Sequence, residues 1–413
     1  MNTRQQKRRS ERRRASVRAG VVGGGALALG LVPTGIAQAS TPIKVTNLHD
    51  SGAGSLRAAI TTADSDTAAT PSSPALITFS SKLSGSIDLK SPLPGAMESI
   101  DIKGPGARKV TLNAGEMPKD SGVPLLYDVF AGTHLTISGL SMDNATDSAT
   151  GGFVDVVDAG LTLNSDTFAR DSGMDGGGAV YVDANSVTID GCTFTDDRAY
   201  YGGAIDAFGS TTAIADSTFV GNHASHGGGA TWAHGGTLKL TGVTVSSNSV
   251  SYSGTSMGQP AGYGGGIGVS YASLTLDDSI VAGDTASGNV HYANHPLFGS
   301  DHRDVWVGKG ASLSAQFSLI QHDYNSLYGL NSTDILDKSP DLGPLQNNGG
   351  QTNTESPPAK SPVINAGKAF GLTVDQRGDK RKVAYPGVNL KKGSDGTDIG
   401  AVELQAPKKK HRH

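Results

Sequence analysis

The sequence predicts an all-β fold, a right-handed parallel β-helix, from three observations that agree. In the first, a glycine pair followed by small or apolar residues recurs four times. Its second glycine falls at 178, 203, 229 and 266, in steps of 25, 26 and 37 residues. In the second, a triplet keeps the same phase, as Cys192-Thr193-Phe194, Ser217-Thr218-Phe219, Val243-Thr244-Val245 and Ser279-Ile280-Val281. A repeat of this length indicates a solenoid or a propeller.

The third observation is the pattern within each repeat. Short runs in which apolar and polar residues alternate, such as Ile100-Asp101-Ile102 and Leu161-Thr162-Leu163, indicate strands with one buried face. Glycine is frequent, at 57 of 413 residues, which is typical of many short strands joined by tight turns. A propeller blade needs about 40 residues, whereas about 25 residues fit one β-helix coil with three short strands. We therefore expect a β-helix over residues 75–339.

Residues 1–39 have the features of an export signal. Residues 1–18 hold eight Lys/Arg and one Glu, the apolar segment 19–36 follows, and Ala37-Gln38-Ala39 fits the small-x-small cleavage rule. Paired arginines such as Arg13-Arg14 leave a twin-arginine route open beside general secretion. We expect a secreted or cell-surface protein that starts at Ser40. No later stretch is apolar enough to span a membrane.

The exported chain is acidic. Without the signal, residues 40–413 carry a formal charge of −11, and residues 40–407 carry −15 because the basic tail at 405–413 holds four positive charges. This charge argues against nucleic acid as a partner. The single cysteine, Cys192, excludes an intramolecular disulfide. Because other repeats carry serine or valine at its position, we expect a small side chain stacked in the coil interior.

Residues 40–74 are expected to cover the first coil, since a solenoid must protect its open end. Ser55 is a plausible N-cap of a short helix in which Leu56, Ala59 and Ile60 share one face. The run Gly54-Ser55-Leu56-Arg57-Ala58-Ala59-Ile60 resembles the CSLREA element found near the start of many secreted bacterial β-helix proteins. The leading cysteine of that element is absent.

The repeats resemble a second family. Gly202-Gly203-Ala204-Ile205 with Phe219-Val220-Gly221-Asn222 is similar to the GGAI…FxxN pair of the polymorphic outer membrane protein repeats. That resemblance implies an adhesin or a structural surface protein. At a solenoid turn, Asn or Asp bonds to the neighbouring backbone. A structural ladder is therefore expected from Asp197, Asn222, Asn248 and Asp284.

The end of the chain resembles a third family. Four blocks occur in order over residues 340–404: Asp341–Thr352, Ser361–Gly367, Asp375–Gly378 and Asp398–Glu403. They resemble the choice-of-anchor Q domain, a C-terminal module of secreted β-helix proteins that precedes varied surface anchors. Here only the basic tail 405–413 follows. We interpret the module as a C-terminal cap in which Arg377 is tied to a carboxylate.

Strand alternation sorts the glycine-pair strands into two faces. Counted from the second glycine, positions +2 and +4, such as Val180 and Val182, are predicted to point inward, together with Gly268 and Ser270 in the fourth repeat. Positions +1, +3 and +5 are predicted to point outward, including Ile267 and Val269 in that repeat. The outward set contains the candidate site: the acids Asp155, Asp183 and Asp206, and the rings Tyr181, Phe208, Trp232, His234 and Tyr271.

Aromatic rings beside carboxylates suit a sugar chain, because rings stack on the sugar face and acids bond hydroxyl groups. Asp155 and Asp206 lie two coils apart, so about 9.6 Å separates their backbones, near the upper limit of about 9.5 Å used by inverting glycosidases. Asp155, Asp183 and Asp206 are therefore candidate catalytic acids, and the rings are candidate substrate-binding residues. The insertion Val250–Tyr263 could form one wall of a groove.

Several alternatives stay open. The site could bind polysaccharide without catalysis, hold calcium through its acids, or be a solvated face with no ligand. Between residues 151 and 300 only Arg170, Arg198 and Lys239 are basic, which is too few for lyase chemistry on an acidic polysaccharide. We expect a monomer that needs no cofactor and binds extracellular polysaccharide. A non-enzymatic adhesin or structural surface protein is the alternative.

Overall fold

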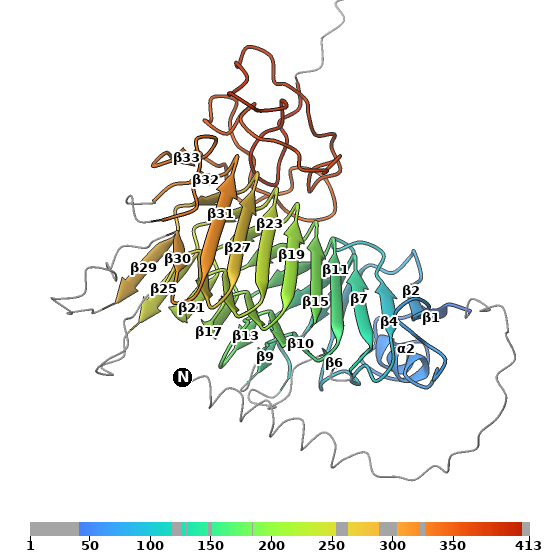
Figure 1. Cartoon of the computed structure of the whole chain (residues 1–413). Helices are drawn as coiled ribbons and strands as arrows, with labels where there is room; N and C mark the ends of the chain where they lie inside the picture. Colours follow the sequence, from blue (N-terminus) through green and yellow to red (C-terminus); the bar gives the residue numbers. More distant parts are fainter. Residues whose placement is uncertain are drawn as a thin grey trace, which may run out of the picture. The chain divides into compact units, whose positions relative to one another are not determined.

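The computed structural model describes residues 41–117, 126–128, 131–147, 151–183, 185–252, 263–288, 304–322 and 327–406. These residues belong to one compact unit. The predicted signal 1–39 and most of the predicted basic tail 405–413 lie outside them. Within the described residues the chain winds into stacked coils of short parallel strands, a parallel β-helix (Figure 1). The predicted fold class is confirmed.

Sheets A and C are the two longest sheets. Sheet A consists of β1 (Ile43–Val45), β2 (Ala75–Phe79), β4 (Ile100–Lys103), β7 (His134–Ser138), β11 (Gly160–Asn164), β15 (Ser186–Asp190), β19 (Thr211–Ala215), β23 (Thr237–Thr241), β27 (Ser273–Asp277) and β31 (Ser312–Gln316). Sheet C consists of β3 (Gly85–Asp88), β5 (Val110–Asn113), β8 (Ser141–Asp143), β12 (Thr167–Ala169), β16 (Thr193–Thr195), β20 (Thr218–Val220), β24 (Thr244–Ser246), β28 (Ile280–Ala282), β32 (Leu319–Ile320) and β33 (Ile335–Leu336).

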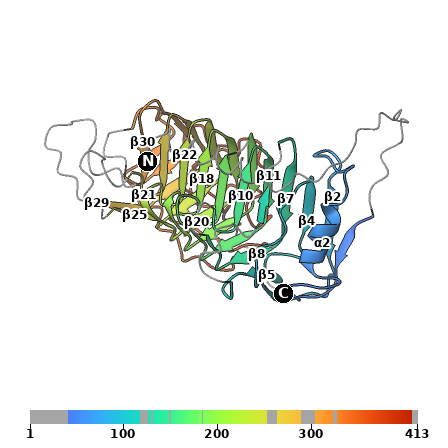
Figure 2. The ribbon, with the colours of Figure 1, turned by 90° about the horizontal axis from the view of Figure 1, so that it is seen from below.

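Sheets B and D complete the coils. Sheet B, which follows the glycine pairs, consists of β6 (Leu126–Asp128), β10 (Val154–Val157), β14 (Val180–Asp183), β18 (Ile205–Phe208), β22 (Thr231–His234), β26 (Ile267–Ser270) and β30 (Val305–Val307). Sheet D consists of β9 (Thr146–Asp147), β13 (Ser172–Gly173), β17 (Arg198–Tyr201), β21 (His223–Gly227), β25 (Ser249–Tyr252) and β29 (Thr285–Gly288). Figure 2 shows the coils stacked side by side from below.

A full coil contains four strands, not the three predicted. The coil that begins at β14 continues through β15 and β16 to β17 before β18 starts the next coil. The additional strand belongs to sheet D and lies between the ladder position and the glycine pair. Its residues, such as Arg198-Ala199-Tyr200-Tyr201, lack clear alternation of apolar and polar side chains, so the period-2 pattern did not reveal a strand there.

The interior is filled by columns of equivalent residues. Phe168, Phe194 and Phe219 are fully buried and stack with ring centroids 4.9 and 4.7 Å apart. Cys192 is also buried, and its backbone N–H donates to Ser217 Oγ at 3.0 Å. The first and third residues of the repeated triplet therefore point into the interior on one side of the coils, and the expectation for Cys192 is confirmed.

The predicted ladder is confirmed. The backbone N–H groups of Asp171, Asp197, Asn222 and Asn248 donate to the side-chain oxygen of the equivalent residue one coil further on, at 2.7–3.0 Å. Asp284 continues the series to Asp304. All six side chains are buried. The ladder closes the turn between sheets C and D, where strands end and backbone donors need acceptors.

The helix predicted after Gly54 is α2 (Leu56–Ala63). Ser55 Oγ accepts the backbone N–H of Ala58, and the buried side chains include Leu56, Ala59 and Ile60, as predicted. Arg57 fixes the segment, because its guanidinium donates to Asp50 and to the carbonyl oxygens of Ser91 and Pro92. The helix lies beside β1 and β2, the first two strands of sheet A.

Residues 340–404 lie along the flank of the coils. The module predicted as a C-terminal cap therefore covers the side of the solenoid and not its last coil. They are built of turns and isolated bridges, and they bond to the outward threonines of sheet C: Thr193 to Asn353, Thr218 to Gln376 and Thr244 to Ala401. Arg377 is held by Asp375 at 2.7 Å, as predicted.

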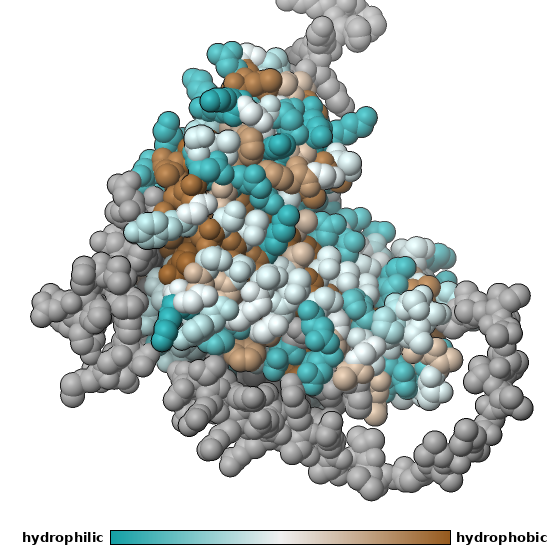
Figure 3. All heavy atoms as spheres, in the orientation of Figure 1, coloured by the Kyte–Doolittle hydropathy of each residue, from teal (hydrophilic) through white to brown (hydrophobic). Residues whose placement is uncertain are grey.

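The last coil is covered by residues 327–336. Ala315 of β31 donates its N–H to Gly329 O, and β33 pairs with β32. Half-buried leucines, Leu327, Leu330 and Leu336, pack against the core here. Figure 3 shows apolar side chains gathered around β31 to β33.

Candidate functional site

The predicted site residues lie on the outer face of sheet B. Asp155, Tyr181, Asp206 and Trp232 are direct neighbours in register on β10, β14, β18 and β22. Asp155 and Asp206 are therefore two coils apart in one column, the relation on which their predicted spacing depends. Two residues further along the same strands, Phe208 of β18 pairs with His234 of β22.

The faces predicted for the fourth repeat are wrong. Trp232 pairs with Gly268, and the core contains Ile267 and Val269, which were expected outside. The cause is the glycine triplet at 264–266. The first glycine of each pair has a positive φ, and here that residue is Gly264 with φ 62°. The second glycine is thus 265, and the step is 36 residues, the same step that separates Val243 from Ser279.

Tyr271 lies in the turn after β26 and not on the strand. Its φ is 53°, and 50% of its surface is exposed. Its ring remains near the predicted site, because the centroids of Tyr271 and His234 are 5.5 Å apart. His234 in turn stacks on Phe208 at 5.2 Å. Phe208, His234 and Tyr271 thus form a row of three rings across successive coils.

The acids point away from the core, yet two of them are buried. Asp155 is 2% exposed and Asp206 is 6% exposed. The chain at Gly176 lies against Asp206, since a Cβ at that glycine would overlap the carboxylate. Burial raises the pKa of Asp206 well above its usual range, and the nearby Asp183 raises it further. Asp183 is half-buried. Among the described residues, this face offers no open pair of carboxylates to a substrate.

Aromatic rings gather on this face and on the adjoining sheet D. Trp232, only 7% exposed, stacks on Trp306 with centroids 5.6 Å apart. Tyr263 lies 4.3 Å from Trp306, and Tyr201 lies 4.9 Å from Trp232. Together with the neighbouring rings we call this cluster the aromatic surface: Tyr200, Tyr201, His226, Trp232, Tyr263 and Trp306. Trp232 and His226 are its buried floor, and the other four rings are half-buried.

Glycines make room for the floor of this surface. A Cβ at Gly227 or Gly268 would overlap the ring of Trp232. Gly268 occupies the position between Trp232 and Trp306 in the column, so the two indoles meet across a residue without a side chain. This contact explains how rings two coils apart can stack.

Sequence reasoning included Trp232, and Tyr263 as the end of the insertion Val250–Tyr263 beside this face, but it missed the other members of the aromatic surface. Tyr200, Tyr201 and His226 belong to sheet D, which was not predicted, and Trp306 follows residues 289–303, which carry no repeat marker. Of the insertion Val250–Tyr263, which was predicted as a groove wall, residues 253–262 lie outside the described residues, and Tyr263 lies against Trp306. The placement of both tryptophans in one column required the strand register.

The histidines of this region are neutral near pH 7. Burial lowers the pKa of His226 to about 4 and also lowers the pKa of His234. In the described part of the chain, no group of three or more His, Cys, Asp or Glu side chains is placed to hold a metal ion. The aromatic surface therefore consists of indole, phenol and imidazole rings, and burial disfavours a charge on the imidazole of His226.

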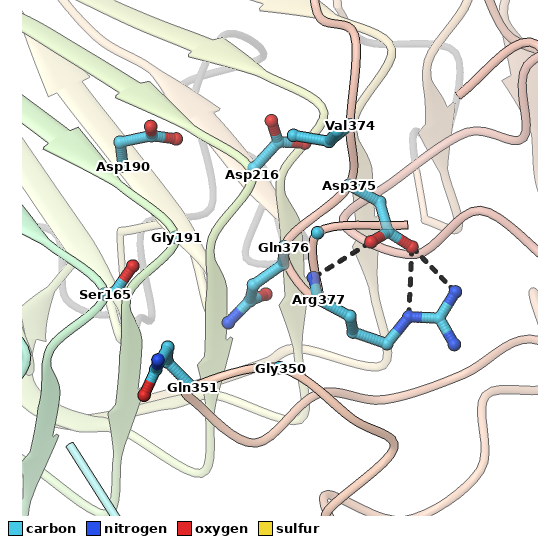
Figure 4. Close-up of a pocket in the computed structure, with 11 residues that line it drawn as sticks. Ser165, Asp190, Gly191, Asp216, Gly350, Gln351, Val374, Asp375, Gln376 and Arg377 are labelled. Atoms are coloured by element: carbon cyan, nitrogen blue, oxygen red, sulfur yellow. Dashed lines mark hydrogen bonds and ion pairs between the residues drawn. The ribbon is translucent and has the colours of Figure 1, made fainter. Parts of the chain in front are cut away.

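Apart from the aromatic surface, the structure has a pocket where the C-terminal module meets the turns between sheets A and C (Figure 4). Its volume is about 420 Å³. Gln376 forms its floor, with its amide bonded to Cys192 O, Thr193, Thr218 and Thr352. Asp375 is bound by Arg377, and Asp216 by Arg381. Gln376 and Asp216 thus help to hold the module to the coils, and the Asp375–Arg377 pair lies within the module.

No protein-family model matches this chain, and no curated protein is similar to it. The three resemblances therefore depend on the motif residues alone. None of the helices in the described residues is both long and apolar enough to cross a membrane.

Proposed function

We propose that this protein is exported and binds an extracellular polysaccharide through the aromatic surface. The observation that carries the proposal is the continuity of that surface: rings from coils one or two apart contact one another with centroids 4.3–5.6 Å apart, and four of the six side chains are half-buried. Aromatic rings with a polar edge suit sugar chains, which present apolar faces and hydroxyl groups together. The export signal at 1–39 supports an extracellular ligand.

The charges favour a neutral polysaccharide. Asp155, Asp183 and Asp206 lie beside the rings, and the basic residues of this part of the chain are few. An anionic sugar would therefore be repelled by the acidic body of the protein. Binding without hydrolysis is favoured, because catalysis by two carboxylates needs both groups to reach the glycosidic bond, and Asp155 and Asp206 are buried.

The test is affinity electrophoresis of the purified protein in gels that contain one neutral or one acidic polysaccharide each. Trp306→Ala and Tyr263→Ala should each weaken binding about tenfold or more, because loss of a central aromatic contact costs above 1.4 kcal/mol. Tyr328→Ala is the matched control, since this tyrosine is 92% exposed at the end of the solenoid. Circular dichroism verifies the fold of each variant.

Two outcomes contradict the proposal. If Trp306→Ala and Tyr263→Ala bind as the parent does, the rings only stabilise the coils. If no polysaccharide is retained but the protein still adheres to cells, the adhesin alternative is favoured. A reducing-sugar assay with Asp206→Asn beside the parent tests hydrolysis, and we expect no sugar release from either protein.

A further inference from the structure

The ladder between sheets C and D contains two kinds of residue in equivalent positions. Asn222 and Asn248 use both ends of the amide: Oδ1 accepts a backbone N–H, and Nδ2 donates to the carbonyl oxygen of Phe194 or Phe219 in the preceding coil, at 3.1 Å. Each asparagine thus satisfies a donor and an acceptor at once.

Asp171 and Asp197 make only half of these bonds. Oδ1 of Asp171 accepts from Ala145, and Oδ1 of Asp197 accepts from Asp171. Oδ2 of each is buried and has no hydrogen-bond partner among the described residues. Both side chains are 0% exposed. A buried oxygen without a partner is costly in a carboxylate, which can only accept.

The strand register shows which carbonyl oxygen would accept a proton on Oδ2 of Asp171 or Asp197. Met142, Phe168, Phe194 and Phe219 are paired in sequence across sheet C. The carbonyl oxygen equivalent to the one that Asn222 bonds is therefore that of Phe168 for Asp197 and that of Met142 for Asp171. A protonated carboxyl group has the donor and the acceptor of an amide in nearly the same geometry.

We propose that Asp171 and Asp197 are neutral carboxylic acids in the folded protein, and that they replace asparagine in the ladder only while each carries a proton on Oδ2. The stability of this part of the solenoid therefore depends on pH. When the proton is lost, two buried negative charges face each other on adjacent coils, about 4.8 Å apart along the sheet, and the donors to the two carbonyl oxygens disappear.

The surrounding charges support this assignment. The groups that face the pair are the acids Asp143 and Asp196 and the single cation Arg170, whose guanidinium is bonded to Asp143. Burial raises the pKa of Asp171 well above its usual range, and the neighbouring Asp197 raises it further. Burial likewise raises the pKa of Asp197.

The sign of the pH effect follows from these directions. Unfolded aspartate has a pKa of about 3.9, and the folded values are higher. The folded state therefore binds more protons above that pH, and stability falls as pH rises through the raised values. The stabilisation that the two protons supply is therefore complete in acid and is lost only as the pH rises through the raised pKa values.

The test is the thermal unfolding midpoint of the exported chain at about pH 5, above the unfolded pKa of about 3.9, and at about pH 8. Asp197→Asn supplies a donor that does not titrate. It should therefore raise the midpoint at pH 8 and narrow the difference between the midpoints at the two pH values. Asn222→Asp should lower the midpoint at pH 8 and widen that difference. Asp337→Asn is the matched control, because Asp337 is an exposed aspartate with φ 54° in the turn after β33 and is not among the groups that face the pair, and it should change neither quantity.

A second measurement does not depend on variant stability. The infrared spectrum of the parent at neutral pH should contain the C=O stretch of a protonated carboxyl group, and this band should diminish in Asp197→Asn. The proposal is overturned if the band is missing from the parent. It is also overturned if Asp197→Asn lowers the midpoint at both pH values, since the position would then require an ionised carboxylate.

Discussion

The outer faces of sheets B and C are built by the same repeats, but they are covered in different ways. On sheet C, the outward threonines bond to residues 340–404, which come from far along the chain. On sheet B, the outward Trp232 stacks on Trp306 two coils away and lies against Tyr201 of sheet D. One face is sealed by a distant segment, and the other keeps half-buried rings that a ligand could reach.

The charges beside buried carboxyl groups also differ between the two faces. Beneath the module, Arg381 is fully buried and contacts Asp216 at 2.5 Å and Asp278 at 3.5 Å. On sheet B, the neighbouring charge that affects Asp206 is another acid, Asp183. A buried carboxyl group is stabilised either by a cation or by a proton. The difference indicates that the module face is held by ion pairs and the aromatic face by packing.

The largest effect should come from removal of the buried cation. Arg381→Met leaves Asp216 and Asp278 without their partner, so it should lower the free energy of unfolding by about 4–5 kcal/mol. Urea denaturation measures this loss. Lys382→Met is the control, because Lys382 is an exposed neighbour paired with Asp395, and it should cost about 0.5 kcal/mol or less. Equal losses in the two variants would show that the module is not held by the ion pair.

The next prediction compares Trp232 in the buried floor of the aromatic surface with Trp306, one of its half-buried rings, which we call the rim. Trp232→Ala removes a buried ring that fills the space over Gly268, so it should cost about 3–4 kcal/mol. Trp306 is half-buried, and Trp306→Ala should cost about 1–2 kcal/mol. Denaturant titration of both variants gives the comparison. If Trp306→Ala costs as much as Trp232→Ala, the rim is structural and the distinction between floor and rim is lost.

The smallest effect compares two glycines that share a backbone conformation. Gly209 and Gly242 both have φ 64°, so alanine should cost about 1–2 kcal/mol at either site. Gly209 has open space around its Cα, whereas a Cβ at Gly242 would overlap Arg381 and Leu372 of the module. Gly242→Ala should therefore destabilise the protein more than Gly209→Ala in the same titration. Equal costs would mean that the module yields easily at this turn.

The sequence predicted the features that repeat. Glycine pairs, the triplet with its phenylalanines and the Asp/Asn turn residues recur because each coil meets the same neighbours above and below, so one coil reveals the environment of the next. The fold and the ladder were correct for this reason, and the buried face of α2 was correct because Leu56, Ala59 and Ile60 recur at helical spacing. The register failed only at residues 264–266, where three successive glycines allow two alignments and only the triplet marker distinguishes them.

The tertiary structure decided the features that do not repeat. No pattern shows that Gly176 covers Asp206, that Arg381 passes Gly242 to join two coils, or that Trp306 stacks on Trp232 across Gly268. These contacts join residues whose separation along the chain follows no period, and their energies depend on burial. The sequence by itself therefore determined the solenoid and its outward acids and rings. Only the packing of distant segments decided which of those side chains a ligand could reach, because exposure is a property of what lies over a residue.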